Sequence, residues 1–131
     1  MIKFSYTILY VADVAKTVQF YSEAFGFECR FMTEEHDYAE MITGSTTLAF
    51  ASLELATSNL SLGFKKASID EQAGAIEIGF VVADVALVIE AVKAAGGNCY
   101  EPLRTKPWGQ DVAYVRDLDG HLIEVCTAMS H

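Results

Sequence analysis

The sequence predicts an α+β fold made of two βαβββ halves, and three observations lead to this prediction. Residues 6–15 are matched by residues 77–86, with the block Val-Ala-Asp-Val-Ala identical in both copies. Each copy runs from a β-rich segment, through an aspartate suited to cap a helix, into a helix-like stretch that stops at glycine. Three short β-rich runs separated by turns then follow in each half. In a chain of 131 residues, we expect the two halves to share one core.

The two helices are defined by their caps and by the spacing of their apolar residues. Asp13 and Asp84 are the expected N-caps, while Gly26 and the Gly96-Gly97 pair are the expected stops. Helical spacing gives each helix one apolar face, formed by Val14, Val18, Tyr21 and Phe25 in the first and by Val85, Ile89, Val92 and Gly96 in the second. The strands that follow are predicted at 28–34, 38–42 and 46–52, and at 98–101, 111–116 and 121–127.

These elements divide the expected single domain, residues 1–131, into modules at about 1–52 and 75–128. The intervening residues 53–74 mix small and polar side chains with Lys65-Lys66, and we interpret them as a connecting arm. Four apolar side chains indicate that the arm packs on the partner half or on another subunit: Leu55, Leu60, Leu62 and Phe64.

Alternation along the strands separates the side of each sheet that a helix covers from a bare side. In the first strand of the second half, the unbroken apolar side suits the helix, which leaves Glu77 on the bare side. In the last strand, Ile123 and Val125 have the character of core residues, so Glu124 also lies on the bare side. Two carboxylates are therefore predicted on one open face.

Composition and charge narrow the range of partners and locations. Nine Lys and Arg against eighteen Asp and Glu give a net charge of −9, which repels nucleic-acid phosphates and anionic membrane surfaces. No apolar run approaches the length of about 20 residues that a membrane-spanning helix needs. The first residues lack the pattern of a secretory signal, so we expect a cytoplasmic protein. Three widely spaced cysteines favour neither a disulfide framework nor a cysteine zinc site.

The paired halves and two longer motifs resemble the vicinal oxygen chelate superfamily, which includes glyoxalase I, bleomycin-resistance proteins, fosfomycin-resistance enzymes and extradiol dioxygenases. The motifs are VADVAKTVQFY at 11–21, leading to Phe25-Gly-Phe27, and KPWGQ at 106–110, leading to RDLDGHLIEV at 116–125. The resemblance covers essentially the whole chain and is closest in pattern to the bleomycin-resistance branch. It implies a curved mixed sheet around a cup that holds a metal, a ligand or both, and it implies a homodimer.

The superfamily's metal ligands usually stand at the start of the first strand of each half and near the middle of the last strand. Matched position by position, this chain has Tyr6, Glu77, Glu124 and, in the first half, Ala49 or, with a one-residue shift, Leu48. The histidines expected there are absent, and imidazole is what suits such sites to transition metals. We therefore expect no cofactor, and a divalent metal such as Mg²⁺ or Mn²⁺ only through Glu77 and Glu124.

Glu77 and Glu124 are the candidate catalytic residues. Two carboxyls close together in a partly dry cavity share a proton near neutral pH, and can then act as acid and base or hold a cationic group. The alternative is that Glu124 pairs with Arg104 or Arg116 and has no chemical role. Five residues are predicted to bind ligand, with Arg104 and Trp108 placed in one loop: Tyr6, Tyr38, Arg104, Trp108 and Tyr114.

Three functional hypotheses follow. The first is a small-molecule-binding protein of the bleomycin-resistance type, independent of metal, that sequesters a planar or cationic compound. The second is a divergent metal-dependent lyase or isomerase of the glyoxalase type that uses Glu77 and Glu124, so whether the chain is an enzyme stays open. The third is an accessory domain whose cup has lost its function.

Overall fold

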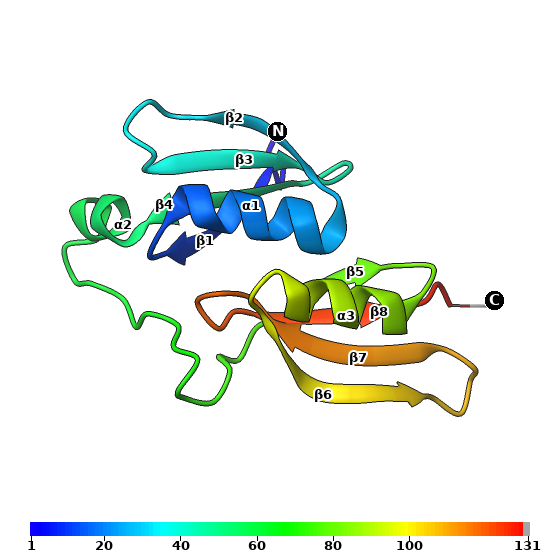
Figure 1. Ribbon diagram of the computed structural model, residues 1–131. Coiled ribbons are helices and arrows are strands. Elements are labelled where there is room, and N and C mark those ends of the chain that lie inside the picture. Colours follow the sequence, from blue (N-terminus) through cyan, green and yellow to red (C-terminus); the bar gives the residue numbers. More distant parts are fainter. Residues whose placement is uncertain (130–131) are drawn as a thin grey trace. The chain divides into compact units, whose positions relative to one another are not determined.

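The computed structural model describes residues 1–129 and divides into two units, each with a four-stranded mixed sheet (Figure 1). Unit 1 comprises residues 1–22 and 26–66, and unit 2 comprises residues 23–25 and the chain from residue 67 onward. Along the chain, the order βαβββ occurs twice. This confirms the predicted α+β class and its pair of βαβββ modules.

The first sheet has the strand order β1-β4-β3-β2, in which β1 and β4 are parallel and the other neighbours are antiparallel. Its β1 is followed by α1, and a second helix, α2, follows β4. The bounds are β1 Tyr6–Val11, α1 Val14–Phe25, β2 Glu28–Met32, β3 Tyr38–Ile42, β4 Thr47–Ser52 and α2 Leu53–Asn59.

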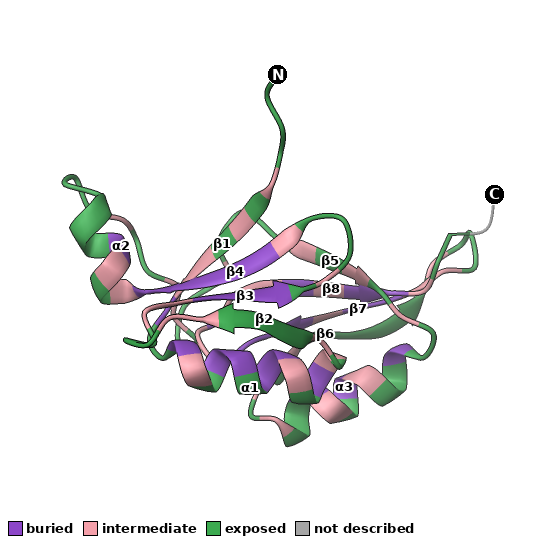
Figure 2. Ribbon diagram, turned by 90° about the horizontal axis from the view of Figure 1, so that it is seen from above, coloured by how far each residue is buried: buried purple, intermediate pink, exposed green. Residues whose placement is uncertain are grey.

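The second sheet repeats this arrangement with the order β5-β8-β7-β6, and β5 and β8 are its parallel pair. Figure 2 shows that the inner strands of both sheets are mostly buried, whereas the edge strands β2 and β6 are largely exposed. The bounds are β5 Ile78–Val81, α3 Val85–Ala94, β6 Asn98–Thr105, β7 Asp111–Arg116 and β8 Leu122–Cys126.

Both long helices begin as the sequence predicts. The Asp13 carboxylate accepts a hydrogen bond from the Lys16 N–H at 3.0 Å, and Asp84 accepts one from the Leu87 N–H at 3.1 Å. Gly26 ends α1 in the left-handed region at φ 77°, where glycine carries no Cβ penalty. The predicted apolar faces include these buried side chains: Val14, Val18 and Tyr21 in α1, and Val85, Ile89 and Val92 in α3.

The predicted arm differs from the structure at its start. Residues 53–59 form α2, because the Ser52 hydroxyl caps the helix by accepting from the Leu55 N–H at 3.1 Å. Beyond α2, Leu62 is fully exposed, while Phe64 packs edge-on against Tyr10 with ring centroids 4.9 Å apart. Only part of the apolar set expected to pack therefore does so within unit 1.

The later part of the arm is attached to unit 2 by Arg116, whose side chain is buried. Its guanidinium donates to the carbonyls of Gly120 (2.9 Å), Glu71 (2.8 Å) and Ser68. Tyr100 lies against the same guanidinium, 5.0 Å from ring centroid to Cζ, and its hydroxyl accepts from the N–H of arm residue 73 at 3.1 Å. Carbonyls thus replace the carboxylate that usually accompanies a buried arginine.

One strand is longer than its sequence pattern indicates. β6 continues to Thr105, where the prediction ended at residue 101, so Arg104 belongs to a strand and not to the loop that holds Trp108. The pairing of β6 with β7 shifts register twice, and such bulges let an edge strand continue past Pro102.

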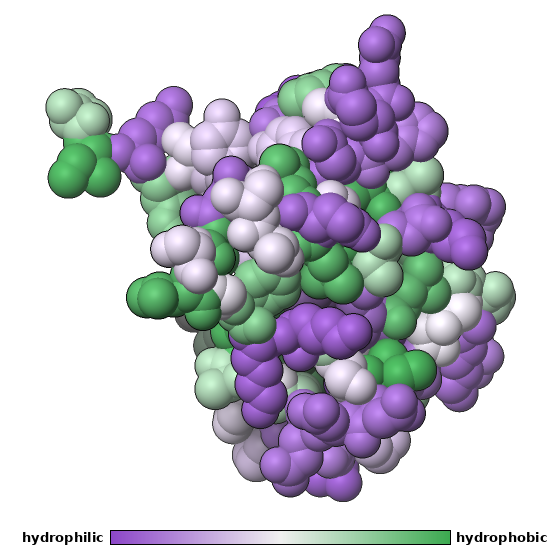
Figure 3. All heavy atoms as spheres, turned by 90° about the vertical axis from the view of Figure 1, so that its left-hand side faces the viewer, coloured by the Kyte–Doolittle hydropathy of each residue, from purple (hydrophilic) through white to green (hydrophobic). Residues whose placement is uncertain are grey.

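The described surface combines polar and apolar side chains. On the face shown in Figure 3, apolar side chains (green) stand among hydrophilic ones (purple). Tyr6, Ile8 and Val81 are exposed on β1 and β5, on the side of each sheet that its helix leaves bare. Among residues 1–129, we find no helix with the length and apolar character needed to cross a membrane.

Candidate functional site

The second sheet brings Glu77, Glu124 and Tyr114 together on its bare side. Glu124 lies in the central strand β8 directly opposite Tyr114 of β7, and Glu77 immediately precedes the other neighbour, β5. The Tyr114 hydroxyl donates to Glu124 Oε1 at 3.1 Å, and Glu77 lies close enough to Glu124 for the Glu124 carboxyl to raise its pKa. We call Glu77 and Glu124 the acid pair.

The acid pair binds a proton more readily than an isolated carboxyl does. Glu77 is solvent-exposed, but desolvation beside the sheet and the negative charge of Glu124 raise its pKa. Partial burial and the neighbouring Glu124 carboxylate also raise the pKa of Tyr114, which keeps its phenol protonated. Tyr114 is therefore a hydrogen-bond donor at neutral pH, and the pair can hold one proton between two oxygens.

The two arginines considered as partners of Glu124 lie elsewhere. Arg104 forms an exposed ion pair with Glu101 at 3.7 Å, and Arg116 donates to carbonyls, as described above. Within residues 1–129, neither arginine contacts the acid pair. The alternative in which Glu124 pairs with one of them is wrong, because Arg104 pairs with Glu101 of its own strand and Arg116 donates to the carbonyls of Gly120 and of the arm.

Trp108 and Arg104 lie in different surroundings. Trp108 is 60% exposed in the turn between β6 and β7, and its indole N–H donates to Gln110 Oε1 at 2.8 Å. Gln110 Nε2 in turn donates to the Thr127 carbonyl at 2.9 Å. Arg104 and Tyr114 line a shared hollow of about 300 Å³ together with Lys106. The hollow therefore adjoins the tyrosine that binds Glu124.

The strand register shows which residue of unit 1 corresponds to Glu124. The antiparallel neighbour of Glu124 is Tyr114, and the residue in the same place in the first sheet is Ala49, whose antiparallel neighbour is Glu40. The parallel pairings with β1 and β5 agree with this match. The one-residue shift to Leu48 is therefore wrong, and the position carries no donor side chain.

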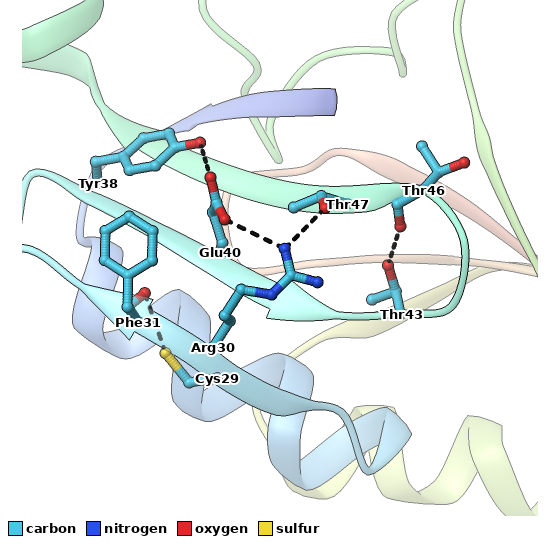
Figure 4. Close-up of polar contacts among 8 residues, drawn as sticks. All are labelled: Cys29, Arg30, Phe31, Tyr38, Glu40, Thr43, Thr46 and Thr47. Atoms are coloured by element: carbon cyan, nitrogen blue, oxygen red, sulfur yellow. Dashed lines mark hydrogen bonds and ion pairs between the residues drawn. The ribbon is translucent and has the colours of Figure 1, made fainter. Parts of the chain in front are cut away.

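Unit 1 places a different carboxylate on its bare side, which sequence reasoning missed. Glu40 of β3 is buried and accepts from the Tyr38 hydroxyl at 2.8 Å and from Arg30 Nη1 at 3.4 Å (Figure 4). Arg30 Nη1 also donates to Thr47 Oγ1 at 3.1 Å. Alternation over 38–42 places Glu40 on the same side as Tyr38, so this signal was present in the sequence.

Tyr38 and Tyr6 therefore differ in how far they are available to a ligand. Partial burial and the hydrogen bond to Glu40 raise the pKa of Tyr38, and its hydroxyl is already used as a donor. Tyr6, at the start of β1, is 53% exposed. Of the two tyrosines predicted to bind ligand in unit 1, Tyr6 is the more accessible.

The donor set does not fit the metal centre that the superfamily resemblance implies. No group of three or more His, Cys, Asp or Glu side chains able to hold a metal gathers among residues 1–129. Tyr6 and Ala49 offer a phenol and a methyl group in unit 1, while one oxygen of Glu124 accepts from Tyr114 in unit 2. Two carboxylates remain, fewer than the three or four protein ligands usual for zinc.

Comparison with known proteins agrees with the fold and the sequence motifs. The model of the Glyoxalase/Bleomycin resistance protein/Dioxygenase superfamily matches residues 3–125, and the chain belongs to this superfamily. A probable lactoylglutathione lyase of Vibrio parahaemolyticus is 30% identical over 125 residues, which cover 92% of this chain and 86% of that protein. The predicted superfamily is thus confirmed.

Two further similarities differ in the share of each chain that they cover and in the conclusion that they support. A putative lactoylglutathione lyase of Brassica oleracea is 31% identical over 94% of this chain, but the chain spans only 43% of that protein. The crystal structure of a glyoxalase-related enzyme from Fulvimarina pelagi superposes with a TM-score of 0.84 at 22% identity, covering 98% of this chain and 89% of that one. At this identity the structural likeness supports the fold alone.

Proposed function

We propose that the chain binds a small organic molecule on the bare side of its second sheet, through the acid pair and Tyr114 and without a metal ion. The observation that carries the proposal is the neighbouring pair of carboxyls at adjacent strands, which has no ion-pair partner among residues 1–129. Such a pair favours a ligand that brings a positive charge or several hydrogen-bond donors.

The surroundings of the pair support a planar cationic ligand. The net charge of −9 attracts cations over distance, and Tyr114 places an aromatic ring beside the pair. A ligand ammonium or amidinium group would replace the shared proton as the balancing charge, so binding would release a proton. We therefore expect affinity for such a ligand to rise with pH across the titration of the pair.

Binding is tested by titrating the full-length protein with a panel of basic aromatic compounds. Calorimetry and the fluorescence of Trp108, the chain's one tryptophan, would report saturable binding. The double variant Glu77→Gln, Glu124→Gln should weaken it by about tenfold or more, since it removes charge-assisted contacts. Glu90→Gln, an exposed acid on α3, makes the same kind of change elsewhere and should leave affinity unchanged. Absence of saturable binding across the panel, or equal affinity in the double variant, would contradict the proposal.

A second candidate is proton transfer of the glyoxalase type, favoured by the relatives named lactoylglutathione lyase. In the acid pair, the ionised carboxyl can accept a proton from a carbon next to a carbonyl group, while the protonated carboxyl can return one to the neighbouring carbon. Tyr114 would hold Glu124 in position through its hydrogen bond. This reaction is an isomerisation, so it needs no oxidant or reductant.

The lyase candidate is tested with methylglyoxal and glutathione, following thioester formation. The protein is assayed after chelation and again with added Mg²⁺, Mn²⁺, Zn²⁺ or Ni²⁺. Glu124→Gln should lower the rate by about a hundredfold or more, the usual contribution of a general acid or base, and Glu90→Gln should not. Thioester formation no faster than without protein under every condition would exclude this activity, and the ligand-binding titration would still decide the first proposal.

The accessory-domain hypothesis and the homodimer are tested in the same experiments. If the domain has lost its function, the double variant of the acid pair should leave every measured property of the protein unchanged. A homodimer should elute with twice the chain mass of 14.3 kDa in size-exclusion chromatography with light scattering. A mass equal to one chain at micromolar concentration would contradict the dimer.

A further inference from the structure

Unit 1 carries a hollow of about 200 Å³ whose charged lining is entirely cationic. It lies beside the start of β1, and we call it the cationic hollow; its lining includes Lys3, Tyr6, Arg30, Ser45 and Thr47. In a chain with twice as many acidic as basic residues, a hollow that places two cations together with four hydroxyl-bearing residues is distinctive. All of these residues belong to unit 1, whereas the acid pair belongs to unit 2.

Arg30 is held in a fixed orientation that leaves donors unused. One nitrogen, Nη1, makes both of its contacts, to Glu40 at 3.4 Å and to Thr47 at 3.1 Å. Within residues 1–129, Nε and Nη2 have no hydrogen-bond partner, and Figure 4 shows Nη2 turned away from Glu40. A guanidinium offers five N–H donors, and those that remain suit a carboxylate or phosphate oxygen.

The negative charge of Glu40 does not cancel the positive charge of the cationic hollow. Glu40 meets Arg30 through one long contact and also accepts from Tyr38, so its negative charge is divided between two donors. Lys3 forms no ion pair among the described residues and adds a second positive charge at the rim. Thr47 Oγ1 accepts from Arg30, which leaves its own hydrogen to donate.

We propose that the cationic hollow binds the carboxylate or phosphate group of a small molecule. Arg30 binds the anion through its unused N–H groups, Lys3 adds charge, and the hydroxyls of Ser45 and Thr47 donate from the side. Tyr6, whose ring also lines the hollow, covers the organic part next to the anionic group. Tyr6 and Glu77 occupy corresponding positions in the two sheets. This position therefore contributes to anion binding in unit 1 and to the binding of a proton or cation in unit 2.

The proposal is tested by titrating isotope-labelled full-length protein with acetate and, separately, with inorganic phosphate at constant ionic strength. Saturable shifts of the backbone amide signals of Arg30, Ser45 and Thr47 are expected from one or both anions, and the tighter one identifies the ligand class. Sodium chloride alone should produce only small shifts that do not saturate. The proposal is wrong if neither anion gives saturable shifts at these amides, or if chloride gives the same ones.

Variants separate a built site from general attraction to positive charge. Arg30→Gln should weaken anion binding by about tenfold and Lys3→Gln by a smaller factor, because a charge-assisted hydrogen bond outweighs an exposed charge. Arg30→Lys should weaken anion binding by an intermediate factor, because it keeps the positive charge but loses the planar set of N–H donors of the guanidinium. Lys16→Gln removes an exposed cation of the same unit outside the hollow and should leave affinity unchanged. Equal effects of Lys3→Gln and Lys16→Gln would overturn the proposal, and this comparison does not require Arg30→Gln to fold.

Discussion

The two units share one strand order, and each places a carboxylate bound to a tyrosine on the bare side of its sheet, yet they balance that charge in opposite ways. In unit 1, Glu40 faces the guanidinium of Arg30. In unit 2, the neighbour of Glu124 is another acid, Glu77. The same sheet geometry therefore supports an ion pair in one half and a proton-binding pair in the other. One fold can carry two different kinds of polar site when a few side chains change.

A second difference lies in the turn before the last strand of each sheet. Gly44 and Gly120 both have positive φ, at 110° and 98°. A Cβ on Gly44 would meet nothing within 4 Å, whereas one on Gly120 would lie 2.5 Å from Arg116 Nη2 and 2.9 Å from the carbonyl carbon of Ser68. The turn of unit 2 is crowded because Arg116 and the arm pack onto it.

The largest expected effect comes from substituting these two glycines. Gly44→Ala should cost about 1–2 kcal/mol, the ordinary penalty for a side chain in the left-handed region. Gly120→Ala should cost about 3–5 kcal/mol, since it also displaces the buried guanidinium from its carbonyl partners. Urea unfolding of both variants measures the difference, and equal losses would show that the arm is not attached through Arg116.

The next effect compares the two ion-paired arginines. Arg30→Met should lower the free energy of unfolding by about 1–2 kcal/mol, because it leaves the buried Glu40 carboxylate without its cation. Arg104→Met should lower it by about 0.5 kcal/mol or less, since both members of that pair are exposed. The comparison is made by urea unfolding at neutral pH. A larger loss for Arg104→Met would reverse our ranking of the two sites.

Removing a tyrosine hydroxyl should also cost more stability in unit 1 than in unit 2, but the difference should be smaller than for the arginines. Tyr38→Phe removes a 2.8 Å hydrogen bond to buried Glu40 and should cost about 1 kcal/mol. Tyr114→Phe removes a 3.1 Å bond to half-buried Glu124 and should cost about 0.5 kcal/mol. Thermal unfolding of the two variants beside the parent protein measures both. If Tyr114→Phe is the more damaging, Glu124 depends on its tyrosine more than Glu40 does.

The smallest effect is the pH dependence of stability in unit 2. Because the pKa of Glu77 is raised on folding, the folded state binds more protons than the unfolded state between the ordinary value of 4.5 and the raised pKa. The contribution of Glu77 is therefore fully present below this window and is lost as the pH rises through it. Glu77→Gln should remove that loss and stabilise the protein at neutral pH by about 0.5 kcal/mol or less, since the residue is exposed.

The acid pair itself can be tested by titration. Glu124→Gln removes a negative charge beside Glu77, so the pKa of Glu77 should fall toward its ordinary value, while Glu90→Gln should leave it in place. NMR signals of the glutamate carboxyl carbons report both titrations. An unchanged pKa of Glu77 in Glu124→Gln would mean that desolvation alone raises it.

Much of the fold could be predicted because its determinants are local. Asp13 and Asp84 cap the next turn of chain, Gly26 meets a backbone requirement at its own position, and the repeat pairs each helix with its strands. Helix α2 was missed although Ser52 is a good N-cap, because the stretch after it reads as mixed small and polar residues. The part of β6 beyond residue 101 was not predicted, because Pro102 indicates the end of a strand.

The candidate site was predictable only where alternation within one strand was enough. Period-two alternation placed Glu124 on the bare side, and the repeat placed Glu77 at the start of β5. Arg30 escaped notice because its contact with Glu40 joins β2 to β3 across a register shift. The structure likewise directed Arg116 to the carbonyl of Glu71 in the arm, 45 residues earlier, and this contact does not follow from spacing along the chain.

The sequence by itself determined the superfamily, the two βαβββ modules, the ends of the long helices and the side of the sheet on which Glu77 and Glu124 lie. These depend on backbone preferences and periodicity, which act between residues close in the chain. Tertiary structure alone decided that Glu77 meets Glu124, that Glu40 meets Arg30, and that Arg116 holds the arm. Charge balance depends on distance in space, and the pairing of strands brings together side chains that the chain itself keeps far apart.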